Sequence, residues 1–225
     1  MAIEIEFINS IPYFTGLSSD ELDSIGRLVV EKKFERGEMI VYEDEPTEAL
    51  FFIVSGAVKV FKTSIEGKEQ ILNVVHPGES FNDVPVFDDG TNTASAQAMS
   101  PVVLYELRKN DMMELMETHP EIATNTIRVL AKQVRDLVSL VEDLSFRHVI
   151  GRVARILLQH IGDGAAAGNG LRLTQQDMAA MAGTAREVVG RSLKTLEDEG
   201  MIRLERNRIV ITDKEALSDK VEVAF

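Results

Sequence analysis

Short apolar runs alternate with turn residues from Lys33 to Leu107. The runs are rich in β-branched and aromatic residues and cover residues 39–42, 50–54, 58–61, 70–75 and 102–105. Glycine, proline and aspartate separate the runs, and strands at such regular spacing are typical of a sandwich or barrel. A short helix is expected ahead of them at 18–30, because Ser18 or Ser19 can cap a first turn that holds Asp20 and Glu21.

The apolar period becomes helical after Pro120. Apolar residues then recur at alternating spacings of three and four, at Ile127, Leu130, Val134, Leu137, Val141 and Leu144. This heptad pattern predicts a long helix with one apolar edge, which we call the seam. We expect the seam to form a homodimer interface with a second copy of the chain. Packing of the same edge within one chain is the alternative.

Helices and a hairpin are expected in the C-terminal part. A helical segment at 146–160 and a glycine-rich loop at 162–170 come first. Thr174 and Asp177 then form a variant of the capping box, at the start of a short helix that Gly183 ends. A second helix at 185–199, with Thr184 as its cap, follows a glycine turn, and alternating runs around 206–207 predict a β-hairpin. This order is the pattern of a winged helix-turn-helix.

The second of these helices presents residues that can read DNA. Its first two turns carry Arg186, Glu187, Gly190 and Arg191, in the part of a recognition helix that enters the major groove. Arginine can bond guanine, glutamate can accept from cytosine, and Lys194 can reach a phosphate. Glycine inside a helix costs about 1 kcal/mol against alanine, and close approach to DNA supplies a reason for it. A solvated charged face is the alternative interpretation.

The net charge of −13 argues against a nucleic-acid partner until its distribution is considered. Residues 1–145 contain 12 Lys and Arg against 26 Asp and Glu, a net −14, whereas residues 146–212 contain 10 against 7, a net +3. Only the C-terminal part therefore suits phosphate. The absence of cysteine excludes disulfides and a cysteine-ligated iron–sulfur cluster. With no basic leader and no long apolar run, we expect a cytoplasmic protein without a membrane partner.

One motif carries a family resemblance. The segment Thr174-Gln175-Gln176-Asp177, followed by Gly183-Thr184-Ala185-Arg186-Glu187 and Gly190-Arg191, is similar to the DNA-binding signature of the Crp/Fnr family of bacterial transcription regulators. The pattern Arg186-Glu187-x-x-Gly190-Arg191 resembles the version in the family's cyclic-AMP-responsive branch, whose half-site is TGTGA-like. The resemblance implies DNA contacts from Gln175, Gln176 and Thr184 as well as from the recognition helix.

The resemblance covers nearly the whole chain and implies an α+β architecture in three parts. These are an effector-sensing double-stranded β-helix (a jelly roll of the cyclic-nucleotide-binding type) at 1–118, a dimerisation helix at 119–145, and a winged helix-turn-helix DNA-binding domain at 146–225. It also implies an allosteric homodimer on double-stranded DNA, with RNA polymerase as a further partner.

The same resemblance places an effector pocket at Phe81, Asn82, Asp83, Val84, Thr93, Ala94, Leu137 and Val138. Cyclic-nucleotide-binding members hold the phosphate with a Phe-Gly-Glu turn and a later Arg-Ser or Arg-Ala pair. Asn82-Asp83 and Thr93-Ala94 stand in these places, so no arginine can bind the phosphate, and we expect the Asp83 carboxylate to repel it. Leu137 and Val138 are apolar where those members contact adenine. We therefore expect an effector other than cyclic AMP.

Several alternatives stay open for the sensor domain: a small apolar or aromatic ligand, haem through an unexpected axial ligand, or a filled core that binds nothing. The histidines at 76, 119, 148 and 160 are interpreted as turn, cap or surface residues rather than haem ligands. A cyclic-nucleotide-responsive or haem-dependent gas-sensing regulator of the same family is the alternative function. No Ser–His–Asp set, glycine-rich phosphate loop or metal-ligand spacing occurs, so we expect no enzymatic activity.

Overall fold

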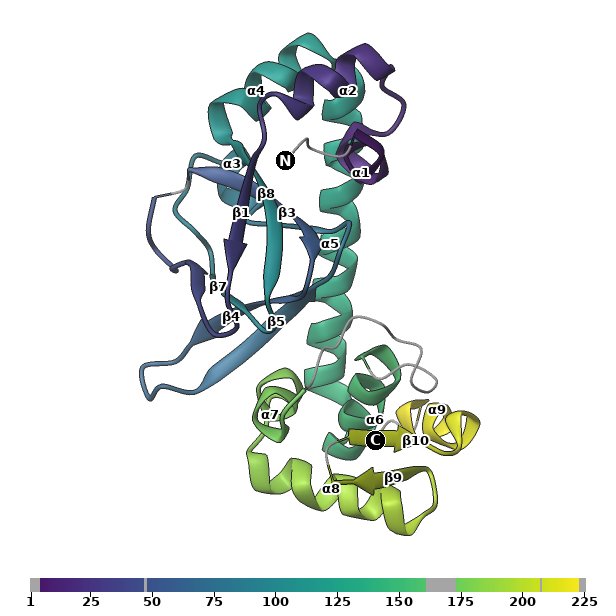
Figure 1. Cartoon of the computed structure of the whole chain (residues 1–225). Helices are drawn as coiled ribbons and strands as arrows, with labels where there is room; N and C mark the ends of the chain where they lie inside the picture. The colour runs from purple at the N-terminus through teal and green to yellow at the C-terminus, as the bar shows by residue number, and fades with distance from the viewer. Residues whose placement is uncertain (1–4, 47, 161–172, 207, 223–225) are drawn as a thin grey trace. The chain divides into compact units, whose positions relative to one another are not determined.

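The structure is a computed structural model and describes residues 5–46, 48–160, 173–206 and 208–222 (Figure 1). The chain forms two compact units. The first contains residues 1–62 and 73–136, and the second contains residues 63–72 and 137–225. The glycine-rich segment at 162–170 and Asn207, both expected in turns or loops, lie outside the described residues.

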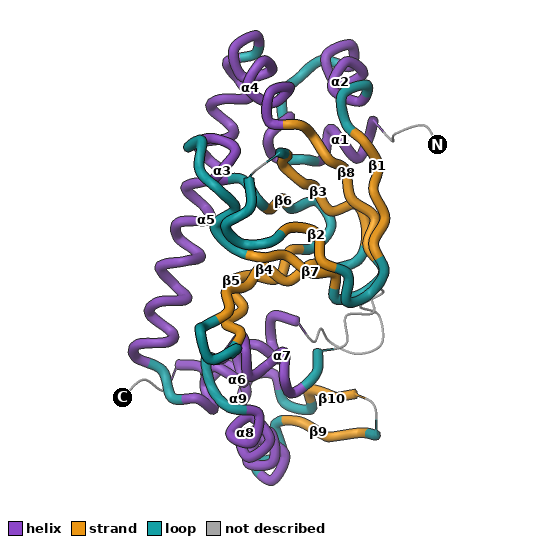
Figure 2. The backbone as a smooth tube through the Cα atoms, turned by 90° about the vertical axis from the view of Figure 1, so that its left-hand side faces the viewer, coloured by secondary structure: helices purple, strands orange, loops and turns teal. Residues whose placement is uncertain are grey.

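Two four-stranded sheets form the double-stranded β-helix, in the orders β1-β8-β3-β6 and β2-β7-β4-β5. Figure 2 shows the two sheets lying one over the other. Their strands are β1 (Val30–Phe34), β2 (Met39–Val41), β3 (Ala49–Ser55), β4 (Val58–Thr63), β5 (Glu69–Val75), β6 (Ser80–Phe81), β7 (Ser95–Ala98) and β8 (Val102–Arg108). Each of the five predicted runs coincides with a strand, so the β-rich prediction is confirmed. The prediction omitted the charged β1, the two-residue β6 and the small, polar β7.

Apolar cores lie on both faces of the sheet that contains β3. Alternation along β3 directs Phe51 toward the other sheet, into a core that also contains Leu104 of β8 and Ala96 of β7. Leu50 and Phe52 belong to the opposite core, which helices cover. The helices of this part are α1 (Ile5–Ser10), the 3-10 helix η1 (Pro12–Phe14), α2 (Ser19–Gly26), α3 (Val84–Phe87), α4 (Lys109–Thr118) and the start of α5.

Helix α2 is shorter than the sequence predicted. It begins after Ser18, whose backbone N–H donates to Glu21 Oε2 at 2.7 Å, as the capping pattern requires. It ends at Gly26 rather than at residue 30, because Val30 already pairs with Glu106 of β8 in strand β1. The predicted end at residue 30 is therefore wrong. β-branched side chains such as that of Val30 favour strand over helix.

The predicted seam lies on α5 (Pro120–Phe146), a single helix that continues from the first unit into the second. Most seam side chains are exposed, by 68% at Ile127, 60% at Val134, 50% at Leu137, 62% at Val141 and 38% at Leu144, and Leu130 is partly buried. The chain's own cores therefore leave the seam largely uncovered. This exposure favours the interpretation of the seam as an interface over packing within one chain.

The second unit contains the helix-turn-helix and its wing, as the sequence predicted. Its elements are α6 (Val149–His160), α7 (Gln175–Ala182), α8 (Arg186–Asp198), β9 (Ile202–Glu205), β10 (Arg208–Ile211) and α9 (Lys214–Glu222). One apolar core joins four of these helices through Leu157, Met178, Val189 and Leu217. The helix expected at 146–160 starts at Val149, because Phe146 is still the last residue of α5.

Candidate nucleic-acid interface and effector pocket

The start and end of α7 are determined by a capping box and one glycine. Thr174 Oγ1 accepts the backbone N–H of Asp177 at 3.1 Å, and the Asp177 carboxylate accepts the backbone N–H of Thr174 at 2.8 Å. Two donors that the helix leaves unpaired are thereby satisfied. Gly183 ends the helix with a φ of 61°, a left-handed conformation that glycine adopts without strain.

Helix α8 begins two residues after the position that we predicted for its cap. Thr184 is not the N-cap, because its backbone N–H bonds back to Ala179 O at 3.0 Å and it belongs to the turn. Ala185 is the N-cap, with extended backbone angles and no side-chain hydrogen bond. The chain stays extended through Ala185, so Arg186 is the first helical residue and its side chain lies at the N-terminal end of the helix.

Helix α8 has one buried and one exposed face. Val189, Leu193 and Leu196 are at most 1% exposed, and the exposed side chains include those of Arg186, Glu187, Arg191 and Lys194. Residues four apart share a helix face. Arg186 and Gly190 therefore form one row on the first two turns, and Glu187 and Arg191 form the next.

The two arginines of this face have no partner among the described residues. Within the described part of the chain, neither the Arg186 nor the Arg191 guanidinium forms a hydrogen bond or an ion pair. Each guanidinium carries five N–H donors in a planar fork. Both donor sets are therefore available to an external acceptor such as a base edge or a phosphate.

Neither the neighbouring described residues nor the backbone conformation requires a glycine at position 190. A Cβ added there would lie 3.7 Å from Gln175 Oε1, an ordinary van der Waals distance, and the backbone is helical. Gln175 and Gln176 are exposed in the first turn of α7, whereas Thr184 is partly buried in the turn. The structure thus places Gln175 beside α8 without explaining why residue 190 lacks a side chain.

Lys194 differs from the arginines because it is already ion-paired. Its Nζ lies 3.2 Å from Glu197 Oε2 and 3.0 Å from Asp198 Oδ1. Hydrogen bonds to Asp198 and Glu197 raise the pKa of Lys194 above its ordinary value. A phosphate contact from Lys194 would therefore have to compete with these two carboxylates.

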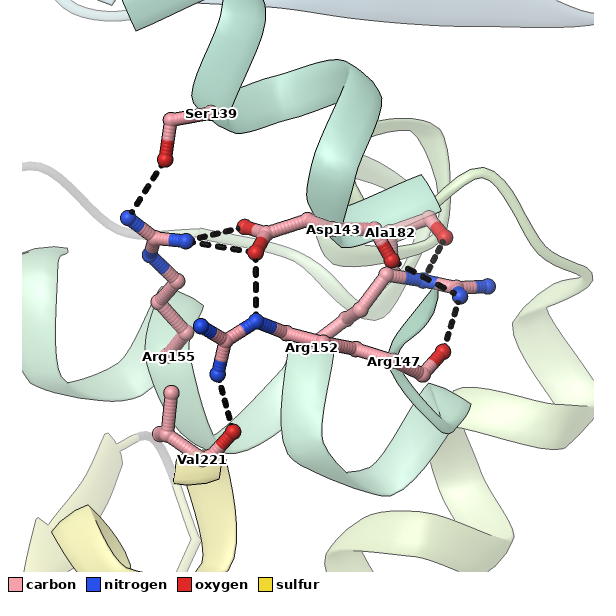
Figure 3. Close-up of polar contacts among 7 residues, drawn as sticks. All are labelled: Ser139, Asp143, Arg147, Arg152, Arg155, Ala182 and Val221. Atoms are coloured by element: carbon pink, nitrogen blue, oxygen red, sulfur yellow. Dashed lines mark hydrogen bonds and ion pairs between the residues drawn. The ribbon is translucent and has the colours of Figure 1, made fainter. Parts of the chain in front are cut away.

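A cluster of charged residues joins α6 to the end of α5 within the second unit (Figure 3). The Asp143 carboxylate accepts Arg155 Nη1 on both oxygens at 2.5 Å, and Arg147 Nε lies 2.7 Å from it. Arg155 Nη2 also donates to Ser139 Oγ at 3.0 Å. The Asp143 side chain is only 13% exposed, so these contacts fix α6 against the last turns of α5.

Three further arginine contacts extend this cluster to α7 and α9. Arg152 Nε donates to Ala182 O, at the end of α7, at 2.8 Å, and Arg152 Nη1 donates to Arg147 O at 2.6 Å. Arg147 also donates to Val221 O in α9. The elements that present α8 are therefore held by side-chain contacts that the sequence interpretation did not identify, although the run of three arginines at 147, 152 and 155 offered a signal.

Asp83, placed in the effector pocket by the sequence, is held by contacts within the first unit. It is 4% exposed and accepts hydrogen bonds from the Tyr13 hydroxyl, from Ser80 Oγ at 2.7 Å and from Gln133 Nε2 at 2.9 Å. Burial, together with the neighbouring Asp83, raises the pKa of Tyr13 far above its ordinary value. These three donors are neutral, so the expected repulsion of a phosphate by Asp83 stays a prediction.

The two residues before Asp83 also have contacts within the first unit. Phe81 is buried and stacks on Phe51 with ring centroids 5.0 Å apart. Asn82 has a φ of 65° and donates from Nδ2 to Ala49 O at 3.1 Å. Asn82 thus holds the turn that precedes α3 against strand β3.

The remaining predicted pocket residues fall into three environments. Ala94 is buried, whereas Thr93 and Val84 are exposed. Leu137 and Val138 lie on α5 within the second unit, 50% and 61% exposed. Sequence reasoning missed Tyr13, Ser80 and Gln133, because two of these residues stand 50 and 70 positions from Asp83 and no local spacing connects them.

Other site classes find little support in the described residues. They contain no group of three or more His, Asp or Glu side chains that could hold a metal ion. Helices long and apolar enough to cross a membrane are also absent from this part of the chain. A cavity of about 460 Å³ in the first unit is lined by residues outside the predicted effector set, namely Glu48, Glu106, Arg108, Lys109, Asn110 and Asp111.

Known families and proteins match both parts of the chain. The cyclic nucleotide-binding domain family matches residues 31–119, and the Crp-like helix-turn-helix domain family matches residues 151–220. A CRP-like cAMP-activated global transcriptional regulator from Mycobacterium tuberculosis is 32% identical over 91% of this chain and 94% of its own. The cyclic AMP receptor protein of Thermus thermophilus is 32% identical over 95% of this chain and 97% of its own. The structure of FixK2 from Bradyrhizobium japonicum, 23% identical, has a TM-score of 0.78 and shares the fold over 88% of this chain and 99% of that one.

Proposed function

The chain belongs to the Crp/Fnr family of DNA-binding transcription regulators, and from this membership we propose that it acts as a homodimer on an inverted repeat with TGTGA-like half-sites. The observation that carries the proposal is the exposed face of α8, where the Arg186 and Arg191 guanidinium groups have no partner within the described residues. An arginine fork fits guanine O6 and N7, and Glu187 can accept from cytosine N4.

Gly190 supports the same assignment. The chain itself leaves room for a Cβ at this position, yet the sequence accepts the cost of glycine, about 1 kcal/mol, inside a helix. A surface that approaches Gly190 from outside accounts for the missing side chain. Gln175, Gln176 and Thr184 would add contacts from α7 and the turn, where exposed amides can bond to phosphate oxygens.

The seam on α5 supports the homodimer. Its exposed side chains repeat every three and four residues, as in helices that pair along a heptad. Pairing of two seams would remove these side chains from water, at about 25 cal/mol for each square ångström of apolar surface. A dimer would also supply two recognition helices, which bind half-sites about one turn of DNA apart, roughly 34 Å.

The effector that we expect is not cyclic AMP. Between Phe81 and Ala94 the chain contains no Lys or Arg, so this segment offers no cationic partner for a phosphate. Asp83 is already engaged by three donors, and Leu137 and Val138 are apolar. A small apolar or aromatic ligand, or haem through an unexpected axial ligand, suits such groups better. Cyclic AMP is the alternative, favoured by the two relatives whose names include it.

Family membership also underlies the remaining expectations. The Crp/Fnr family consists of transcription regulators rather than enzymes, and we expect no catalytic activity. RNA polymerase in the cytoplasm is the expected protein partner.

DNA binding is tested by fluorescence anisotropy with a duplex that contains a TGTGA inverted repeat and with a shuffled duplex of equal composition. Preference for the repeat, lost with Arg186→Ala or Arg191→Ala at a cost of about 1–3 kcal/mol, is the expected result. Equal affinity for both duplexes would refute base reading. Lys194→Ala should weaken both complexes alike.

The effector is tested by calorimetry of the same protein with millimolar cyclic AMP. We expect no saturable heat and no change in DNA affinity. Saturable binding in the micromolar range would replace our proposal with the cyclic-AMP alternative, and leave the assignment of DNA reading intact.

A further inference from the structure

Five cations of α8 and the wing fall into two groups, and Arg206, in the turn of the wing, has no ion pair among the described residues and belongs to neither. Within the described residues, Arg186 and Arg191 have no carboxylate partner. Lys194, Arg203 and Arg208 each form ion pairs with acidic residues of α8 or the wing. The side chains that we assign to base reading are therefore free of carboxylates, and these three cations are ion-paired.

Glu205 forms ion pairs with two arginines at once. Its Oε1 accepts Arg203 Nε at 3.1 Å and Nη2 at 2.8 Å, and its Oε2 accepts Arg208 Nε at 2.5 Å. The hairpin explains this geometry: Arg203 and Glu205 are two apart on β9 and share a face, and Arg208 is the cross-strand partner of Glu205. Both arginine side chains are more than 60% exposed, so the pairs lie on the surface.

Helix α8 carries a second carboxylate arrangement of this kind. Asp198 and Glu197 stand four and three residues after Lys194, so all three share a face, and both carboxylates contact the Lys194 ammonium. Glu197 Oε1 also accepts the backbone N–H of Leu204 at 2.8 Å, which ties α8 to the wing. Asp198 forms no hydrogen bond to the wing among the described residues. A substitution of Asp198 therefore removes its ion pair with Lys194 and leaves the tie between α8 and the wing intact.

These pairs affect two kinds of DNA binding differently. Sequence-independent binding depends on the number of cations that displace counterions from phosphates, about 0.9 in the salt slope for each contact. A cation that is already ion-paired contributes less to DNA affinity. Either it stays bound to its carboxylate and does not contact a phosphate, or it contacts the phosphate and leaves the negative carboxylate nearby. The unpaired arginines that we assign to base reading can bind DNA without first leaving a carboxylate.

We propose that Glu205, with Asp198 in the same role, weakens sequence-independent DNA binding and thereby increases the ratio of specific to non-specific affinity. The inference rests on the proposed DNA-binding function. Glu205 and Asp198 touch no base in this account, and they act by restraining Arg203, Arg208 and Lys194. Hydrogen bonds from Arg208 and Arg203 lower the pKa of Glu205, so its carboxylate stays ionised at neutral pH.

The test compares Glu205→Gln and Asp198→Asn with a matched control, Glu215→Gln. Glu215 is exposed on α9, has no ion pair among the described residues, and undergoes the same loss of one negative charge. Affinity for the TGTGA duplex and for the shuffled duplex is measured between about 50 and 200 mM salt, a range over which phosphate contacts change affinity strongly. Thermal unfolding verifies that each variant is folded.

Glu205→Gln should steepen the salt slope on the shuffled duplex by about 1–2 for each protomer bound, since two arginines are released. Asp198→Asn should steepen it by up to about 0.9. In both variants non-specific affinity rises and the specificity ratio falls severalfold. A slope and ratio equal to those of Glu215→Gln would overturn the inference. The wild-type preference between the two duplexes tests the proposed function separately.

Discussion

Replacing Asp143 with asparagine should loosen the packing of α6 on the end of α5. The Asn side chain has nearly the same shape, so the variant removes charge rather than volume. It weakens the two bonds from Arg155 and the ion pair with Arg147, both centred on a carboxylate that is 13% exposed. Arg152 keeps its bond to Ala182 O, so α7 stays attached to α6.

The size of the effect follows from the burial of the partners. Removing one member of a fully buried pair costs about 3–5 kcal/mol. The Arg147 and Arg155 side chains retain 22% and 28% exposure, so water can solvate part of the charge that is left. Asparagine also keeps one acceptor oxygen. We therefore expect a loss of about 2–3 kcal/mol in the free energy of opening α6.

Hydrogen exchange followed by mass spectrometry measures this quantity segment by segment. A loss of about 2–3 kcal/mol corresponds to exchange that is faster by roughly 30- to 150-fold in α6 peptides. Peptides from β3 in the first unit serve as an internal reference and should not change. Ser139→Ala, which removes one neutral acceptor of Arg155, should accelerate α6 by no more than about tenfold. Exchange of α6 within threefold of wild type in Asp143→Asn would refute the stabilising role of the cluster.

Three further perturbations test other parts of the molecule. Gly190→Ala should stabilise α8 by about 1 kcal/mol in urea unfolding and yet weaken binding to the TGTGA duplex; unchanged DNA affinity would mean that no surface approaches this residue. Leu137→Asp should convert the dimer to a monomer in sedimentation, since it places a charge in the seam, and a persistent dimer would contradict the heptad interpretation. Tyr13→Phe should destabilise the first unit by about 1–3 kcal/mol, because a buried donor to Asp83 is lost. The pKa of Tyr13 is raised by folding, so this difference should shrink as the pH rises above about 10, and a constant difference would argue against a buried neutral hydroxyl.

Elements whose determinants are local were predictable from the sequence. The capping box at Thr174, the glycine after α7 and the alternation of the wing each depend on residues within a few positions, and the structure contains all three elements. The cap of α8 was misassigned because Thr184 has a suitable hydroxyl, but its backbone N–H is already used by the turn. The hydrogen bond that closes the end of α7 thus keeps Thr184 in the turn, although its side chain is of a type that favours the N-cap position.

The environment of Asp83 was not predictable, because two of its three partners come from distant segments. Tyr13 reaches it from η1, Gln133 from α5, and only Ser80 is a neighbour in sequence. Taken alone, an aspartate between a phenylalanine and a short helix looks like a charge directed at a ligand. A buried carboxylate requires donors, and the position of those donors is a property of the packed fold.

Helix α5 carries two sets of residues on different faces, and their interleaving connects the seam to the sensor. Asn125 donates to Tyr13 O at 3.1 Å and Gln133 donates to Asp83, so polar residues anchor this helix in the first unit. Gln133 stands directly before Val134 of the seam, about 100° away around a helix of 3.6 residues per turn. Rotation of α5 that repositioned Val134 against a second copy would therefore also displace Gln133 from Asp83. In the dimer that we propose, the buried carboxylate and the exposed apolar edge would respond to the same motion, which would connect the first unit to the dimer interface without a charged effector.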